Sequence, residues 1–199
     1  MSKAEKTRDF IIQKAAPIFN MKGYAGTSMQ DVTEATGLTK GSIYGNFENK
    51  DEVAVAVYNY SISQLNQRIS DFLADKTKPV DRLVGIAEYY RVNWKKIVAK
   101  GGCPVQNASV EADDNHPVLK KHVQQSIKRW VRSISRIIKE GQETGEIKNS
   151  LIAEEYAYTI ISLLEGGIML SKIMNNQKVF YSALDRIISI IHEEMKSGS

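Results

Sequence analysis

Residues 27–53 contain two short helical patterns joined by a tight turn, and this arrangement constrains the fold more than any other part of the chain. Thr27 and Ser28 are capping residue types ahead of the first pattern, and Thr39 is one ahead of the second. Gly37 lies between the patterns, where a chain that leaves a helix needs a left-handed backbone conformation. A helix, a short turn and a second helix form a helix-turn-helix, the arrangement that places a helix in the major groove of DNA.

Further residues mark the wider stretch 7–53. They form a first-helix core, a Gly–Tyr exit from that helix and a run along the second short helix: Ile11, Ile12, Ala15, Ala16, Phe19, Gly23, Tyr24, Thr27, Gly37, Lys40, Gly41, Ser42, Ile43, Tyr44, Phe47 and Lys50. With these residues the stretch resembles the N-terminal DNA-binding domain of the tetracycline-repressor (TetR) family of bacterial transcription regulators. The resemblance implies a ligand-responsive repressor that binds an inverted-repeat operator on double-stranded DNA as a homodimer and is released by a small-molecule effector.

The rest of the chain is predicted to be all-α, because no segment alternates polar and apolar residues at period two over a useful length. Helical patterns cover residues of about 50–75, 79–100, 105–112, 117–145, 151–175 and 178–196. With the first fifty residues this makes about nine helices. We expect a three-helix DNA-binding domain in residues 1–50 and a larger helical ligand-binding and dimerisation domain in residues 51–199. Pro17, inside the first helix, is expected to kink it.

Composition narrows the class of protein. The chain has 42% hydrophobic and 25% charged residues, as is ordinary for a folded soluble protein. We expect no membrane-spanning segment and no signal peptide, and a single cysteine favours a reducing compartment, so the predicted location is the cytoplasm. The net charge is +4, and residues 1–50 contribute seven Lys and Arg against five Asp and Glu. A DNA-facing patch must therefore be local.

A recognition helix presents its first residues to base edges while neighbouring groups contact phosphates. We therefore expect the DNA contacts to come from Thr27, Thr39, Lys40, Gly41, Ser42, Tyr44, Asn46 and Lys50. Threonine, serine and lysine side chains suit major-groove acceptors, and Gly41 lets the backbone approach closely. Two alternatives stay open: Thr27 and Thr39 as plain helix caps, and Tyr44 as a packed core aromatic. Asn46 replaces the His or Tyr common at this place in the family, and it suits either a phosphate or an adenine edge.

Aromatic and methionine side chains in residues 80–175 suit an apolar pocket between helices. The predicted ligand-binding residues are Tyr90, Trp94, Cys103, Asn107, Trp130, Glu165 and Met169. For the aromatic residues and Met169, core packing is the alternative, and for Glu165 it is an exposed or already satisfied carboxylate. The pocket itself is implied by the family resemblance.

Cys103 has three alternative roles. It lies in a Gly-Gly-Cys-Pro break directly before a helical pattern, where amide dipoles stabilise a thiolate. It is therefore a sensor of an electrophilic effector or an oxidant, a buried residue that lines the ligand pocket, or an inert core residue.

The last two helical patterns are apolar almost all round, whereas a surface helix normally has one apolar stripe. A second stripe needs a second partner. The predicted partner is another copy of the chain, in a two-fold dimer with contacts from Ile161, Leu164, Ile187 and Ile191. The alternative is a helix buried centrally within its own domain.

Other classes of function find less support. His116 and His122 lack metal-ligand spacing, no Gly-rich phosphate loop occurs, and no cofactor or metal is expected. A Cys103–His116 nucleophile pair has no identifiable orienting partner, so an enzyme is not predicted. The competing class is an all-α module whose first fifty residues bind a protein instead of DNA.

Overall fold

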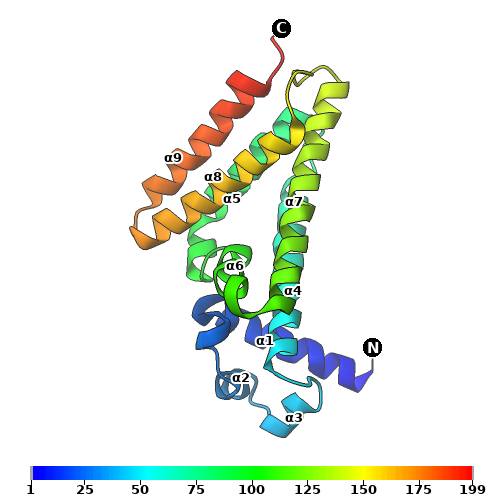
Figure 1. The fold of residues 1–199 in the computed structure, drawn as a ribbon, viewed down its shortest axis with the longest axis vertical. Helices are drawn as coiled ribbons and strands as arrows, with labels where there is room; N and C mark the ends of the chain where they lie inside the picture. Colours follow the sequence, from blue (N-terminus) through cyan, green and yellow to red (C-terminus); the bar gives the residue numbers. More distant parts are fainter. Residues whose placement is uncertain (1, 199) are drawn as a thin grey trace. The chain divides into compact units, whose positions relative to one another are not determined.

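The computed structural model describes residues 2–198, except for the side chains of residues 113–115. Its elements are α1 (Lys3–Gly26), α2 (Met29–Thr36), α3 (Lys40–Tyr44), α4 (Lys50–Phe72), α5 (Pro79–Ala99), α6 (Pro104–Asn115), α7 (Pro117–Glu143), α8 (Ala153–Ile173), α9 (Gln177–Ser189) and a terminal π-helical turn, η1 (Ile190–Met195) (Figure 1). Within the described residues, extended backbone pairs only in an isolated bridge between Ile147 and Lys196. The all-α prediction is confirmed.

The chain packs as two compact units. The first unit contains the residues as far as Leu65 together with Lys100–Ser126, and the second contains Asn66–Ala99 and the residues from Ile127 onward. Helix α6 therefore packs in the first unit, and α4 and α7 each contribute one part to each unit. Packing does not divide the chain at residue 50, so the predicted functional division into 1–50 and 51–199 stays a prediction.

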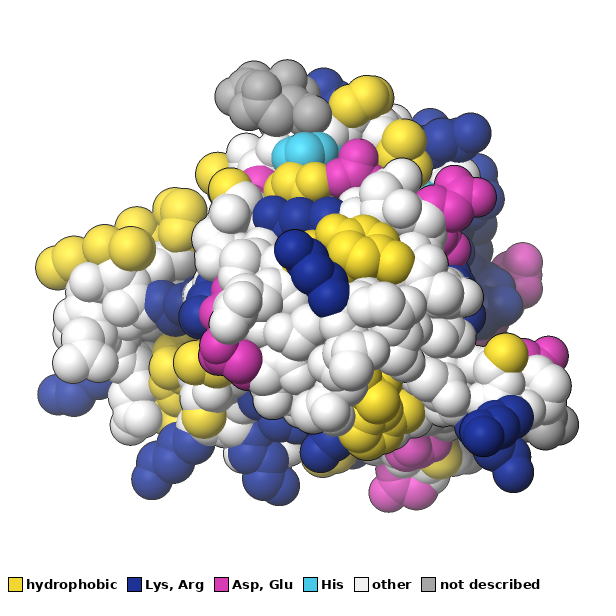
Figure 2. Space-filling model, turned by 90° about the horizontal axis from the view of Figure 1, so that it is seen from below, with side chains coloured by type: hydrophobic (Ala, Val, Ile, Leu, Met, Phe, Trp, Pro, Cys, Tyr) yellow, Lys and Arg dark blue, Asp and Glu magenta, His cyan; other side chains and the backbone are white. Residues whose placement is uncertain are grey.

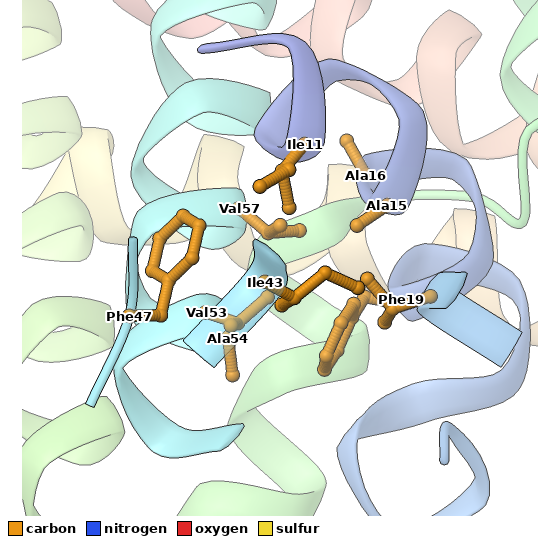
Figure 3. Close-up of a cluster of buried hydrophobic side chains, with 10 residues drawn as sticks. Ile11, Ala15, Ala16, Phe19, Ile43, Phe47, Val53, Ala54 and Val57 are labelled. Carbon is orange, nitrogen blue, oxygen red and sulfur yellow. The ribbon is translucent and has the colours of Figure 1, made fainter. Parts of the chain in front are cut away.

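The core of the first unit positions the helix-turn-helix. Helices α1 and α4 supply apolar residues at helical spacing, and α2, α3 and the turn after α3 add one residue each: Ile11, Ala15, Ala16, Phe19, Val53, Ala54 and Val57, with Val32, Ile43 and Phe47. Figure 3 shows these side chains converging on a single cluster. Burying an isoleucine or phenylalanine contributes about 1.5–3 kcal/mol. Ile43 therefore fixes a helix of only five residues that has little stability of its own.

Local capping defines the ends of the short helices, with two corrections to the sequence predictions. Ser28, not Thr27, is the N-cap of α2, and its hydroxyl accepts a hydrogen bond from the Asp31 amide. Gly37 ends α2 in the left-handed conformation, with φ of 66°. In α1 the backbone departs from helical geometry at Gly23, with φ of 76°, and not at Pro17. Glycine adopts such an angle without strain, so the kink in α1 lies at Gly23.

In the second unit, α8 and α9 form an antiparallel hairpin that lies side by side in Figure 1. Phe180 is fully buried, and its ring centroid lies 4.5 Å from that of Trp94 on α5. The helices come close at Gly167, where an added Cβ atom would lie 2.8 Å from the Cβ of Ala183. None of the helices that the structure describes combines the length and apolar character needed to cross a membrane.

Candidate functional site

Helix α3 and the residue before it form an exposed tip. Thr39, Lys40 and Gly41 are exposed, Ser42 is half-buried, and Tyr44 is 44% exposed. Tyr44 is therefore not a core aromatic. Figure 2 views the molecule from below, the side on which Figure 1 places α2 and α3, and polar side chains and backbone atoms occupy much of this face together with lysine and arginine side chains.

Arg8 holds the turn after α3 in place, a role that the sequence did not predict. Its guanidinium donates hydrogen bonds to the backbone carbonyl of Asn46 and, at 2.6 Å, to the carboxylate of Glu52, and it lies 4.1 Å from the centre of the Phe47 ring. The side-chain Nδ2 of Asn46 donates a hydrogen bond to the backbone carbonyl of Ser42 at 2.8 Å. Asn46 thus closes the end of α3, so its Nδ2 is engaged within the chain.

Thr27 and Lys50 are placed differently from the exposed tip. The Thr27 side chain is 0% exposed, and its hydroxyl donates to the Gly23 carbonyl at 2.6 Å, which makes it a buried anchor at the end of α1. A phosphate contact from this hydroxyl is not supported by its position. The Lys50 ammonium lies 4.3 Å from the centre of the Tyr24 ring, a cation–π contact. Burial of Tyr24 and its hydrogen bond to Asp51 raise the pKa of the Tyr24 hydroxyl to about 12.

A second ion pair orders the start of α2. Lys22 contacts the Asp31 carboxylate at 2.6 Å, and this carboxylate also accepts hydrogen bonds from the amide and hydroxyl of Ser28. The bond from Lys22, followed by those from Ser28, holds the pKa of Asp31 well below its usual range. Asp31 therefore stays charged and bound to the cap, where its charge also suits a helix N-terminus.

Polar contacts attach α6 to α1 within the first unit. The Asn107 amide nitrogen lies within 3.1 Å of the backbone carbonyls of Asn20 and Gly101 and of the Asn20 side-chain oxygen. The Asn20 amide donates in turn to the carbonyl of Gly102 at 3.2 Å. Glu111 accepts a hydrogen bond of 2.7 Å from the Ala25 amide. These residues form a polar latch between two helices of the first unit.

Cys103 and Asn107 belong to this first unit and do not line the larger cavity described next, so their role as ligand residues stays a prediction. Cys103 is the N-cap residue of α6 and is 2% exposed. Such burial favours a packed residue over a surface-reactive thiol.

The second unit contains a cavity of about 570 Å³. Residues from α4, α5, α7 and α8 and the segment after α4 line it: Asn66, Ile69, Ser70, Leu73, Ala74, Lys76, Arg82, Ile86, Tyr90, Arg129, Trp130, Ser133, Ile134, Arg136, Ile137, Ile161, Leu164 and Glu165. Its size suits a small organic molecule. Three predicted ligand residues, Tyr90, Trp130 and Glu165, meet here, and the indole nitrogen of Trp130 donates to Asn66 at 2.9 Å.

Two further predicted ligand residues lie outside this cavity. Trp94 is buried against Phe180 in the core, and Met169 is 49% exposed on α8. Their role as ligand residues is therefore not supported by this cavity. Helical spacing alone does not tell which face of such a helix meets a cavity.

The predicted dimer contacts are also corrected. Leu164, Ile187 and Ile191 are buried within a single chain, and Ile161 is half-buried and lines the cavity. The alternative of a centrally buried helix therefore applies to Leu164, Ile187 and Ile191, and a dimer contact of Ile161 stays a prediction. The large apolar side chains that α8 and the residue after it leave exposed are Tyr158, Met169, Leu170, Ile173 and Met174.

Two of the three histidines, His116 and His122, contact side chains of the first unit. The ring of His116 lies 3.8 Å from that of Tyr24, and Nδ1 of His122 lies 3.1 Å from the side-chain oxygen of Asn59. In the part of the chain that the structure describes, no three His, Cys, Asp or Glu residues come together in a metal-binding cluster.

A helix-turn-helix with an exposed second helix, held by a core from α1–α4 and joined to a helical unit with a cavity, is the architecture of a helix-turn-helix transcription regulator. Residues 11–57 match the model of bacterial regulatory proteins of the tetR family, and residues 79–187 match that of the tetracyclin repressor-like C-terminal domain. The chain belongs to the TetR family of transcriptional regulators.

The similarity to known relatives extends over nearly the whole chain. The HTH-type transcriptional repressor DhaR of Mycobacterium sp. strain GP1 is 29% identical over 188 residues, 94% of this chain and 91% of its own. The crystal structure of a TetR-family regulator from Cytophaga hutchinsonii is 34% identical, with a TM-score of 0.95 over 100% of this chain and 99% of that one. A TetR regulator from Chloroflexus aurantiacus is 32% identical, with a TM-score of 0.93 and 100% of both chains covered.

Proposed function

We propose that the protein is a cytoplasmic repressor that binds an inverted-repeat operator as a homodimer and is released by a small molecule bound in the cavity. The exposed tip of α3 carries this proposal, because Thr39, Lys40 and Tyr44 are free of the core that Ile43 anchors. Thr39, Lys40, Gly41 and Ser42 would face base edges, and Tyr44 and Lys50 would contact phosphates. The relative DhaR is named a repressor, which supports this sign of regulation.

The exposed apolar side chains of α8 are the proposed dimer interface, and a dimer would contact both half-sites of the operator. Ile173 is 81% exposed, and Tyr158, Met169, Leu170 and Met174 extend the apolar surface along the same helix and its end. Exposed apolar groups of this size mark an interaction surface. A two-fold dimer doubles the base contacts and sets two recognition helices about one DNA turn (~34 Å) apart. Replacing Ile173 with Glu should give a monomer in light scattering, whereas the exposed Val92→Glu variant on α5 should remain dimeric.

Communication between the sites is proposed to use helices shared by both units. Helices α4 and α7 each contribute residues to the cavity lining and to the first unit. The Asn107 and Glu111 contacts attach α6 to α1, which carries part of the DNA-binding core. A ligand that binds one state of the second unit more tightly would shift the DNA-competent population through these continuous elements.

The proposal is tested by selecting sites from random duplex DNA with the purified protein at two salt concentrations. An enriched inverted repeat, with affinity that falls steeply as salt rises, is the expected result. Lys40→Ala and Tyr44→Ala should weaken binding to the selected site and leave the dimer intact. The exposed Lys95→Ala variant in α5 is the matched control. Salt-sensitive binding without any enriched sequence would overturn the proposal and favour the protein-interaction module.

A further inference from the structure

The lining of the cavity has two chemically different parts. Apolar side chains that are nearly or fully buried form its floor: Ile86, Tyr90, Ile134, Ile137 and Leu164. Trp130 and Ile161, which also line the cavity, are half-buried. Removing an apolar surface of this kind from water favours a ligand with a hydrocarbon or aromatic body.

The polar part of the lining is mainly basic. Arg129, Ser133 and Arg136 follow each other at helical spacing on α7 and are exposed, while the buried Ile134 and Ile137 lie one position further along the helix. The two stripes are therefore neighbours on one helix. An apolar floor and a basic margin run side by side along the same wall of the cavity.

The charges around the cavity favour an anion. Lys76, Arg82, Arg129 and Arg136 are the basic residues of the lining, and Glu165 is the acidic one. Lys76 contacts Glu88 at 3.5 Å, and the single carboxylate of Glu140 serves both Arg82 and Arg136, the latter at 3.6 Å. In the lining itself, four basic residues stand beside one carboxylate.

The helix that carries the basic margin extends this field. In the part of this helix that belongs to the second unit, residues 127–139 contain five Lys and Arg and no Asp or Glu. Like charges gathered on one surface raise the local concentration of anions and speed their capture. Guanidinium groups also match a carboxylate in geometry, because they donate two parallel hydrogen bonds to it.

We propose that the cavity binds an amphipathic carboxylate, with the carboxylate at Arg129 and Arg136 and the apolar body over Trp130 and the buried floor. This assignment rests on the proposed effector site and adds the chemical class of its ligand. Glu165, the one carboxylate of the lining, disfavours the reverse orientation in which the ligand's carboxylate lies beside it.

The test compares three probes with the same ten-carbon chain: decanoate, decan-1-ol and decyltrimethylammonium. Binding to the full-length protein is measured by calorimetry below the micelle concentration of each probe. Tryptophan fluorescence is recorded in the same titrations, and a change that is lost in Trp130→Phe is assigned to the cavity. The decisive variant is Arg129→Gln with Arg136→Gln. Arg132→Gln is the matched control, because Arg132 is exposed on the same helix but does not line the cavity.

The expected result is that decanoate binds more tightly than either other probe, and that the double variant loses about tenfold in affinity, about 1.4 kcal/mol. The Arg132→Gln variant should stay within about twofold of the original protein. Equal binding of the three probes, or an equal loss in the control variant, would overturn the assignment.

Operator release separates this inference from the proposed function. Decanoate that binds with the expected arginine dependence but leaves the operator complex intact supports the ligand class and contradicts an effector role. A protein that binds its operator but not decanoate contradicts the ligand class alone. Decanoate binding by a protein that selects no DNA sequence supports the ligand class and contradicts the regulator.

Discussion

Replacing Gly101 with alanine should destabilise the first unit much more than the same change at Gly145. Both glycines have positive φ, 92° and 76°. An alanine in this region costs about 1–2 kcal/mol, partly offset by about 0.4–1 kcal/mol from a more restricted unfolded chain. The environments differ, because an added Cβ at Gly101 would lie 2.6 Å from the backbone oxygen of Asn20, whereas at Gly145 it would meet nothing within 4 Å.

The difference between the two variants therefore isolates the contact with Asn20. A side chain cannot swing away to relieve it, since the contacted atoms are the backbone oxygen and, at 3.0 Å, the carbonyl carbon. Overpacking of this kind costs about 1–3 kcal/mol. Gly145→Ala should lose about 0–2 kcal/mol, and Gly101→Ala about 2 kcal/mol more, since the backbone terms are shared.

Thermal unfolding at matched protein concentration measures this difference. For a chain of this length about 2 kcal/mol corresponds to about 4–8 °C between the two midpoints. Gly101→Ala should also weaken operator binding, because the displaced segment belongs to the turn that the latch attaches to α1. Equal midpoints for the two variants would refute the reasoning from the Asn20 contact.

Three further predictions concern single side chains. Asn107→Ala should lower the free energy of unfolding, measured with urea, by about 2 kcal/mol, because the side-chain amide has two donor hydrogens and each net hydrogen bond is worth about 1 kcal/mol. The control, Asn149→Ala at an exposed position, should lower it by less than about 0.5 kcal/mol. Equal losses in the two variants would contradict the stabilising role of the Asn107 contacts. Phe180→Ala should cost about 3–5 kcal/mol in the same assay through loss of a fully buried ring, and a loss below about 1 kcal/mol would show that this core collapses around the cavity. The folded state keeps Tyr24 protonated up to a pKa of about 12, above the unfolded value of 10.0, so its stabilising contribution is present below pH 10.0 and is lost as the pH rises towards 12. Tyr24→Phe should flatten this alkaline part of the stability curve, and an unchanged slope would contradict the assignment.

Local sequence patterns predicted the helices and the helix-turn-helix because the interactions that define them lie within a few residues. Ser28 caps α2 through an amide three positions ahead, and Gly37 ends the helix because its own backbone accepts a positive φ. The choice of Ser28 over Thr27 as the cap was not predictable from the pattern, since both residue types suit the position. The burial of Thr27, which decided it, depends on how the chain packs around it.

The long-range contacts could not be predicted in the same way. Arg8 donates to a carbonyl 38 positions away, and Asn107 to one 87 positions away, and neither residue belongs to a local pattern that indicates its partner. The amount of apolar surface on the last helices was evident in the sequence. Which part of it is buried within the chain, as at Ile187, and which remains exposed, as at Ile173, was not.

The sequence by itself determined an all-α chain with a helix-turn-helix, since capping residues, glycine turns and apolar spacing act between near neighbours. Only the tertiary structure decided that α6 packs with the DNA-binding helices, that Tyr90, Trp130 and Glu165 share one cavity, and that the exposed apolar side chains of α8 are not those expected. The physical reason is that the face a helix buries depends on the elements packed against it, and the period of its own sequence does not identify those elements.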